Sequence, residues 1–282
     1  MRNAKVRFVV ASLQRARGRF GLEVRQRGQV TRMADLEQGG CCRLLFPRIA
    51  GAGVEAATVN ISGGIAAGDR IEGWLICRQG SDLLLTSQAA ERVYRARPHD
   101  APATMTLTCQ IEPDARLEWL PHGTIFFDGS SFNRRMQVDM AGSAEFLFLE
   151  SRIFGRKGSG EVLSGLNIID RLSIKRDGKL VLEEALRLES QSVAKLLAQA
   201  AVSGGQCSVA TIVLVSPNAM SLLEKLRVHL QAPEYAGFAV SAWNGMVVVR
   251  GLAESGWLLE KALRGVLALL RQNRPMPSTW RS

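Results

Sequence analysis

The chain has 282 residues, 46% of them hydrophobic, which is enough to bury a substantial core and argues against wholesale disorder. No apolar run reaches the roughly 18 residues that a membrane-spanning helix needs, so we expect no membrane partner. Arginines follow the first apolar residues closely, which argues against a secretory signal, and we expect a cytoplasmic protein.

The sequence contains five cysteines, and two of them, Cys41 and Cys42, are adjacent. No C-x-x-C spacing occurs, so neither a zinc knuckle nor a thioredoxin-like site is predicted. We expect reduced cysteines that are packed in the interior. A metal-binding role for the Cys41–Cys42 pair at the surface is the alternative.

The net charge of +10 is concentrated near the N-terminus. Residues 1–32 hold nine basic side chains and one acidic side chain, Glu23, so the rest of the chain is nearly neutral. This distribution argues against nucleic acid as the main partner. The basic segment is compatible with docking on an acidic protein, with polyanion binding and with a solvated strand face, and the sequence leaves these alternatives open.

Short strand patterns dominate residues up to about 180, with glycine and proline between them. Residues 104–111 alternate between apolar and polar side chains, and residues 134–140 do the same. Asp177-Gly178 predicts a β-hairpin, because both central residues of a type I′ turn need positive φ. We therefore predict a mainly β, strand-rich fold with a few helices.

From residue 208 onward the pattern becomes β-α-β-β-α. Ser216-Pro217 offers a helix start, Asn244-Gly245 predicts a second hairpin, and Ser255 is the expected N-cap of a final helix. The residues expected to face inward from that helix are Leu258, Ala262, Val266, Leu269 and Leu270. No low-complexity linker occurs, so we predict a single domain over 1–282, with 208–272 packed on the β body.

Motifs for self-contained chemistry are missing from the sequence. Neither a G-x-x-x-x-G-K-[ST] phosphate loop nor a G-x-S-x-G nucleophile elbow occurs, and we predict no enzyme. The histidines His99, His122 and His229 are not spaced as metal ligands, and His229 is expected at a helix surface. A site made of His122 with Glu118 and Asp128 would suit a borderline divalent ion, but a structural histidine is the simpler interpretation.

Several sequence blocks follow one another from about residue 40 to the end. They are N-I-S-G-G-I-A-A-G-D at 60–69, L-T-S-Q-A-A-E-R-V-Y-R at 85–95, A-R-L-E-W-L-P at 115–121, T-I-F-F-D-G at 124–129 and P-M-P-S-T-W-R at 275–281. In this order they resemble the signature blocks of the UreD (UreH) family of urease accessory proteins. Residues 1–35 match only loosely, and Ala66-Ala67 and His122 depart from the family pattern.

The resemblance implies a β-helix-like fold and a chaperone or scaffold role. It implies three partners: urease apoprotein, a helical urease accessory protein and a nickel-binding accessory GTPase. It also implies no permanently bound cofactor, with nickel passing only transiently toward the urease active site. The family-motif residues are Gly63, Gly64, Gly68, Asp69, Gln88, Tyr94, Pro121, Arg135, Arg156 and Trp280.

A nickel path would hold its ion weakly, through oxygen atoms and an occasional imidazole. The candidate residues for such a path are Asp69, Glu118, His122, Asp128, Glu150 and Glu161. The alternative is structural: these acids would stabilise turns or pair with arginines. A polyanion-binding module that uses the N-terminal arginines is the other function that the sequence leaves open.

Overall fold

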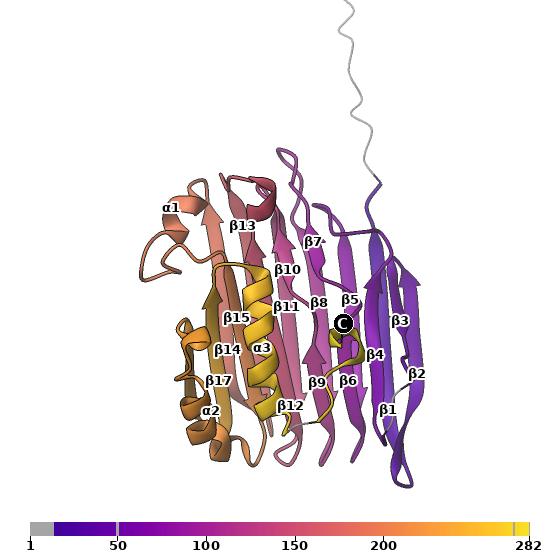
Figure 1. Ribbon diagram of the computed structural model, residues 1–282. Helices are drawn as coiled ribbons and strands as arrows, with labels where there is room; N and C mark the ends of the chain where they lie inside the picture. The colour runs from indigo at the N-terminus through magenta and orange to yellow at the C-terminus, as the bar shows by residue number, and fades with distance from the viewer. Residues whose placement is uncertain (1–13, 49–50, 273, 282) are drawn as a thin grey trace, which may run out of the picture.

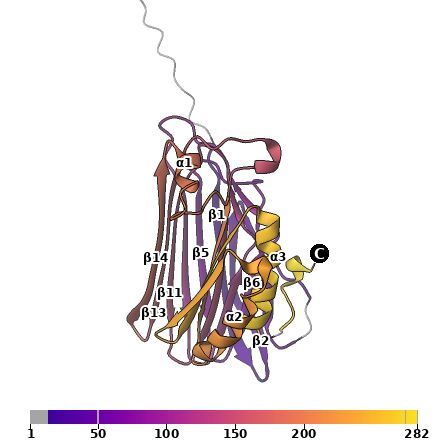
Figure 2. The same cartoon turned by 60° about the vertical axis from the view of Figure 1, so that its left-hand side comes forward.

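The computed structural model describes residues 14–48, 51–272 and 274–281, and two large β-sheets face each other in it (Figures 1 and 2). Sheet A contains, in spatial order, β14 (Lys179–Ser190), β13 (Leu166–Arg176), β11 (Ser131–Met140), β8 (Ala103–Ile111), β5 (Arg70–Cys77), β1 (Arg17–Arg27) and β2 (Val30–Gly40). Sheet B contains β16 (Phe238–Trp243), β17 (Met246–Ala253), β15 (Ser208–Val215), β12 (Glu145–Phe154), β9 (Arg116–Leu120), β6 (Asp82–Ser87), β4 (Val54–Asn60) and β3 (Cys42–Leu45). Two short strands, β7 (Glu91–Val93) and β10 (Thr124–Phe126), extend sheet B beside β12.

Between β4 and β13 the chain passes back and forth between the two sheets. In sheet B, β4, β6, β9 and β12 are parallel neighbours. In sheet A, β5, β8, β11 and β13 are parallel neighbours in the same way. Each passage therefore stacks on the one before it, which confirms the mainly β, β-helix-like prediction.

The alternating sequence patterns place every second side chain between the sheets. On β8, Leu107, Cys109 and Ile111 are buried and the residues between them are exposed, as the pattern predicts. Both predicted hairpins are present, because β13 and β14 pair around Asp177-Gly178 and β16 and β17 pair around Asn244-Gly245. All four of these turn residues have positive φ, as a type I′ turn requires.

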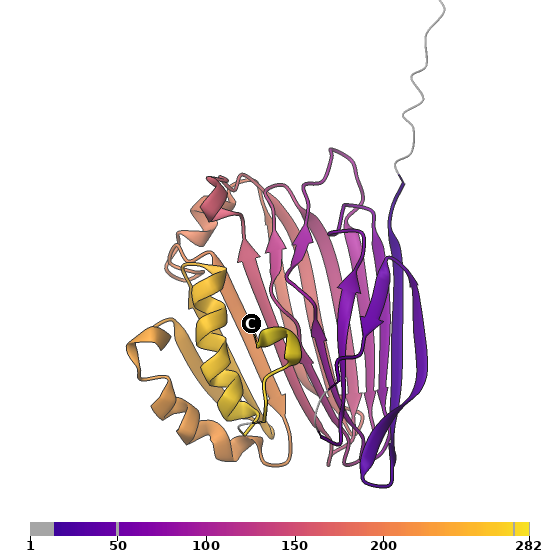
Figure 3. The ribbon, with the colours of Figure 1, turned by 45° about the vertical axis from the view of Figure 1, so that its right-hand side comes forward.

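The helices α2 (Leu223–His229) and α3 (Gly256–Leu270) lie on the outer face of sheet B (Figure 3). A second apolar cluster lies between these helices and the sheet. Ser255 caps α3, since its side chain accepts a hydrogen bond from the Leu258 N–H (3.3 Å). The inward face of α3 differs from the prediction: Leu258 is 42% exposed, and Leu259, Leu263 and Leu267 are buried with Val266 and Leu270. No helix in the described parts of the chain is long and apolar enough to cross a bilayer.

Two further helix predictions need correction. The expected helix start at Ser216 is instead a turn, closed by the Ala219 N–H on the Ser216 carbonyl (3.2 Å), and α2 begins only at Leu223 after a 3-10 turn. The sequence analysis also missed α1 (Val193–Leu197). That helix is a single short turn whose Val193 and Leu197 join the core between the sheets.

The glycines at 63 and 64 provide a matched test of backbone packing. A β-carbon on Gly64 would lie 2.4 Å from the Tyr94 ring, whereas one on Gly63 would meet nothing within 4 Å; both residues have positive φ. We expect Gly64→Ala to lower the free energy of unfolding by about 1–3 kcal/mol more than Gly63→Ala does, because Tyr94 must move. Urea unfolding of the two variants measures this difference. Equal destabilisation would show that the close approach of Tyr94 is unimportant.

Candidate functional site

A pocket of about 240 Å³ opens between the two sheets. Its inner lining is largely apolar and includes Phe20, Trp119 and Phe132 from both sheets. Polar side chains also lie on its wall and rim, and they include Asn60, Gln88, Glu91, Arg92, His122 and Arg134. The pocket therefore offers scattered oxygen and nitrogen atoms within an apolar channel.

Four of the family-like sequence blocks meet at this pocket. The lining includes Gly63 from the first block, Gln88 from the second, Pro121 from the third and Thr124 from the fourth. Gly63, Gln88 and Pro121 follow the ends of β4, β6 and β9, which are parallel neighbours in sheet B. Because the carboxyl ends of parallel strands lie at one edge of a sheet, segments about 30 residues apart in sequence come together there.

A cluster of four charged side chains lies between the two sheets, next to the pocket. One of the four, Arg134, also lines the pocket. Arg134 and Asp170 come from β11 and β13 of sheet A, and Glu150 and Arg152 come from β12 of sheet B. Arg134 forms an ion pair with Glu150 and donates to both oxygens of Asp170, at 2.9 and 2.6 Å. Arg152 also donates to Asp170, at 2.9 and 2.5 Å. The two guanidinium groups and two carboxylates are neutral in sum, as a buried cluster requires.

The two carboxylates of this cluster have pKa values shifted in opposite directions. Burial raises the pKa of Glu150, and Arg134 only partly offsets that effect. Burial acts on Asp170 as well, but Arg134 and Arg152 outweigh it and lower the Asp170 pKa to about 2. Asp170 is therefore the anion that holds both arginines.

Asp69 stabilises a turn. Its carboxylate accepts the Ala16 N–H at 2.7 Å and the Ala66 N–H at 2.8 Å, so it ties the start of β1 to the loop before β5. Gly68 next to it has a φ of +86°, which favours glycine. The motif at residues 60–69 thus shapes a loop beside the pocket.

Asp128 and Glu161 order a second loop region. Asp128 is buried, accepts the Ser164 N–H (2.6 Å) and the Gly165 N–H (3.0 Å), and forms an ion pair with Arg95. Burial raises its pKa, but these backbone donors and Arg95 outweigh burial and lower the pKa overall. Glu161 accepts the Arg156 N–H at 2.9 Å.

Two more motif side chains pack against this loop region, and a third does not. The Arg156 guanidinium lies 4.2 Å from the centre of the Phe127 ring, and the Tyr94 ring meets the same ring edge-on. The Tyr94 hydroxyl donates to the Gly63 carbonyl at 2.6 Å, which joins this region to the pocket rim. Arg135 is exposed on β11, away from the pocket.

His122 is the one candidate ligand among the six that lines the pocket. Its Nε2 lies 3.2 Å from the Thr279 carbonyl oxygen, and its Nδ1 lies 3.6 Å from Glu260. Its ring stacks on Trp280 with the centroids 5.0 Å apart. The C-terminal tail therefore positions His122 at the rim.

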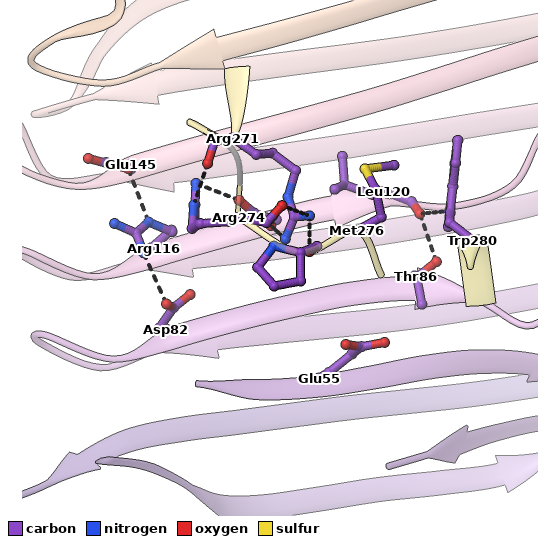
Figure 4. A network of polar contacts seen from close by, with 12 residues as sticks. Glu55, Asp82, Thr86, Arg116, Leu120, Glu145, Arg271, Arg274, Met276 and Trp280 are labelled. Carbon is purple, nitrogen blue, oxygen red and sulfur yellow. Dashed lines mark hydrogen bonds and ion pairs between the residues drawn. The ribbon is translucent and has the colours of Figure 1, made fainter. Parts of the chain in front are cut away.

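The tail, residues 271–272 and 274–281, crosses the outer face of sheet B (Figure 4). Arg271, which is 3% exposed, donates from Nε to Glu118 on β9 at 2.8 Å, and Arg274 lies 2.7 Å from the other oxygen of Glu118. Farther along, the Ser278 N–H donates to Glu55 on β4 (2.6 Å), and Trp280 Nε1 donates to the Leu120 carbonyl (3.1 Å). The tail thus fastens together strands β4 and β9.

The candidate ligands do not form a fixed metal centre. Over the described ranges, no three His, Cys, Asp or Glu side chains are grouped closely enough to hold a metal ion. Asp69, Glu118, Asp128 and Glu161 have the backbone or arginine partners that the structural alternative expects. His229 is partly exposed on α2, and its Nε2 lies 2.8 Å from the Tyr235 hydroxyl.

Comparison with known proteins covers almost the whole chain. The family described as "UreD urease accessory protein" matches residues 16–281. The chain belongs to the UreD family. Relatives named "Urease accessory protein UreD" from Agrobacterium fabrum and Rhizobium leguminosarum bv. trifolii are each 38% identical, over 95% of this chain and 92% and 96% of their own lengths. "Urease accessory protein UreD 2" from Methylorubrum populi is 39% identical over 97% of this chain and 93% of its own length. This chain is accordingly a urease accessory protein.

The charged cluster of this UreD-family chain was not predicted from the sequence as a unit. Glu150 was a candidate residue but Arg152 and Asp170 were not, because the three lie on two strands that face each other across the core. The sequence holds one signal for the cluster. At positions 134, 150, 152 and 170, a charged residue occupies an inward-facing position of a strand whose other inward-facing residues are mostly apolar. Such a side chain needs a buried partner from the other sheet.

The Asp170 pKa predicts a specific acid dependence of stability. Because the folded-state pKa is about 2, below the usual value of about 3.9, ionised Asp170 stabilises the protein above about pH 4 and loses that contribution as the pH falls toward 2. We expect Asp170→Asn to lower the free energy of unfolding near pH 7 by about 2–3 kcal/mol, with a deficit that shrinks below pH 4.

Denaturant unfolding at a series of pH values measures this dependence. Asp139→Asn is the matched control, since Asp139 is exposed on β11. A deficit that stayed constant from neutral pH to pH 2 would contradict the assignment of Asp170 as the stabilising anion.

We expect the two arginines of the tail, Arg271 and Arg274, to contribute unequally to the free energy of unfolding. Arg271→Ala leaves Glu118 buried with one partially exposed partner, and we expect a loss of about 3–5 kcal/mol in the free energy of unfolding. Arg274→Ala removes a side chain that is 31% exposed, so we expect a loss of about 1 kcal/mol or less. Thermal unfolding of both variants measures the ranking, and the reverse order would refute this account of the tail.

Proposed function

We propose that this chain is a non-catalytic scaffold that binds urease apoprotein in the cytoplasm and supports nickel insertion with a helical accessory protein and a nickel-binding GTPase. The observation that carries the proposal is the convergence of four family-like blocks on one pocket, in a chain matched by the UreD family over residues 16–281.

The chemistry of the pocket supports nickel as cargo and not as a resident cofactor. Donor atoms of Asn60, Gln88, Glu91 and His122 are distributed along the wall and rim, and no three-ligand cluster forms among the described residues. An ion that must move on is best held by few ligands at a time. At the inner end, Glu150 and Asp170 neutralise Arg134, so a cation would not meet an uncompensated positive charge.

The polyanion alternative has less support among the described residues. Arg15 pairs with Asp100 at 2.9 Å, and Arg19 pairs with Glu72 at 3.5 Å. Part of the basic segment is therefore neutralised within the fold. The first arginines of that segment lie outside the described residues.

Co-expression tests the proposal directly. The tagged chain is expressed with urease subunits and the other two accessory proteins, and urease activity and co-purified proteins are measured with and without it. We expect urease apoprotein to co-purify with the chain and activity to be lost when the chain is omitted. Full urease activity without the chain would refute the proposed function.

A second part of the same experiment distinguishes the role of the pocket from the role of the surfaces that bind partner proteins. Ala89 lies exposed on the pocket rim, so Ala89→Trp should obstruct the opening without removing a polar group. We expect reduced urease activation with partners still co-purifying. Ala185→Trp, on an exposed position of β14, is the matched control and should activate urease normally. Normal activation by Ala89→Trp would exclude the pocket as a nickel route.

A further inference from the structure

The adjacent cysteines Cys41 and Cys42 lie at the corner between β2 and β3. They are 8% and 6% exposed, so the pair is buried and the surface location considered from the sequence is wrong. The Cys41 N–H donates to the Arg17 carbonyl (3.0 Å), and the Ile61 N–H donates to the Cys41 carbonyl (2.8 Å). These two bonds fix the backbone of the corner.

Both sulfur atoms face the same point. Adjacent residues in a regular strand point to opposite faces, but Gly40 has a φ of +59° and the strand is interrupted at Cys41. A β-carbon on Gly18 would lie 2.3 Å from the Cys42 Sγ and 2.7 Å from the Cys41 Sγ. The missing side chain of Gly18 therefore leaves room in which the two thiols lie together.

The pair is reachable and has a cation beside it. Cys42 lines the pocket between the sheets, which connects the thiols to the rim at Gln88. Burial, and then the neighbouring Cys41, raise the pKa of the Cys42 thiol to about 12, so this thiol is protonated near neutral pH. The Arg43 guanidinium donates to the Cys42 carbonyl (2.7 Å) and the Gly40 carbonyl (3.0 Å). The Arg43 charge favours the Cys42 thiolate, whereas the charge of Glu91, which lines the same pocket, disfavours it more strongly.

We propose that Cys41 and Cys42 form a two-thiolate site for a soft monovalent cation, Cu(I), on the wall of the pocket. Each thiol gives up its proton as a sulfur–copper bond forms, so one Cu(I) replaces two protons and leaves one negative charge, which the charge of Arg43 favours. No electron is transferred. The site does not depend on the proposed role in nickel insertion.

The ligand number decides between metals. Zinc sites in proteins are almost always four-coordinate, or three protein ligands plus water, and Ni(II) favours a square of nitrogen or oxygen donors. No three-ligand cluster is present among the described residues, whereas Cu(I) is satisfied by soft thiolates at low coordination number. A disulfide between the two is disfavoured, because adjacent α-carbons lie about 3.8 Å apart and disulfides usually need about 4.4–6.8 Å.

Anaerobic titration of the full chain with Cu(I), in competition with the chromogenic chelator bicinchoninate, tests the site. We expect equimolar binding that strengthens as the pH rises, since binding releases protons. Cys41→Ser and Cys42→Ser should each abolish it, and Arg43→Leu should weaken it. Cys207→Ser is the matched control, because Cys207 is half-buried elsewhere, and should bind normally. Ni(II) in place of Cu(I) should not occupy the pair.

Phenylarsine oxide gives a second measurement that requires both thiols. It condenses with two thiols, forming two arsenic–sulfur bonds and releasing one water, so mass spectrometry should show one adduct on the wild-type chain and none on either serine variant at Cys41 or Cys42. Circular dichroism of the variants checks that they fold. Copper binding that survives both serine substitutions, or that is lost with Cys207→Ser, would overturn the proposal, as would a Cys41–Cys42 disulfide in the reduced preparation.

Discussion

Parallel stacking of successive chain passages is the constraint on which the rest of the structure depends. Each passage from sheet B to sheet A and back must align with the previous one, because parallel strands share hydrogen bonds along their length. This alignment brings strand ends from distant parts of the sequence to one edge. The pocket forms there, since the loops after β4, β6 and β9 leave the sheet at the same level. Three short loops therefore form part of its wall together with strand residues from both sheets, and no single contiguous motif does so.

The same stacking explains why charge is found between the sheets. A strand with period two cannot turn a single inward side chain outward without shifting its register, so Arg134 on β11 must be compensated where it lies. Asp170, its register partner on β13, does this from the same sheet, and Glu150 and Arg152 add to it from the opposite one. The cluster thereby joins the sheets through polar contacts close to the pocket, in a region that would otherwise be purely apolar.

Much of the fold could be predicted from local patterns, and the failures have physical causes. The alternation at 104–111 and the turns at Asp177-Gly178 and Asn244-Gly245 depend on neighbouring residues alone, so the sequence predicted them correctly. The face of α3 was misplaced because Leu258 and Leu259 are equally apolar, and only packing on sheet B distinguishes them. Arg271, the partner of Glu118, lies 153 residues away in the sequence, and Arg152, a partner of Asp170, lies on a facing strand. The spacing of residues in the sequence does not reveal that these side chains are neighbours in space.

The C-terminal tail shows how these long-range contacts reach the pocket. Arg271 and Arg274 fix the start of the tail on Glu118, and Trp280 ends it against the Leu120 carbonyl, one residue before the pocket-lining Pro121. Between these anchors, Thr279 bonds to Thr86 on β6 (3.0 Å), immediately before Ser87 on the pocket lining. Two of the three loops that form the rim are thus held from outside by a segment that is last in the chain. Docking of the C-terminal residues on sheet B therefore contributes to the shape of the rim, so that residues far apart in the sequence jointly position the pocket opening.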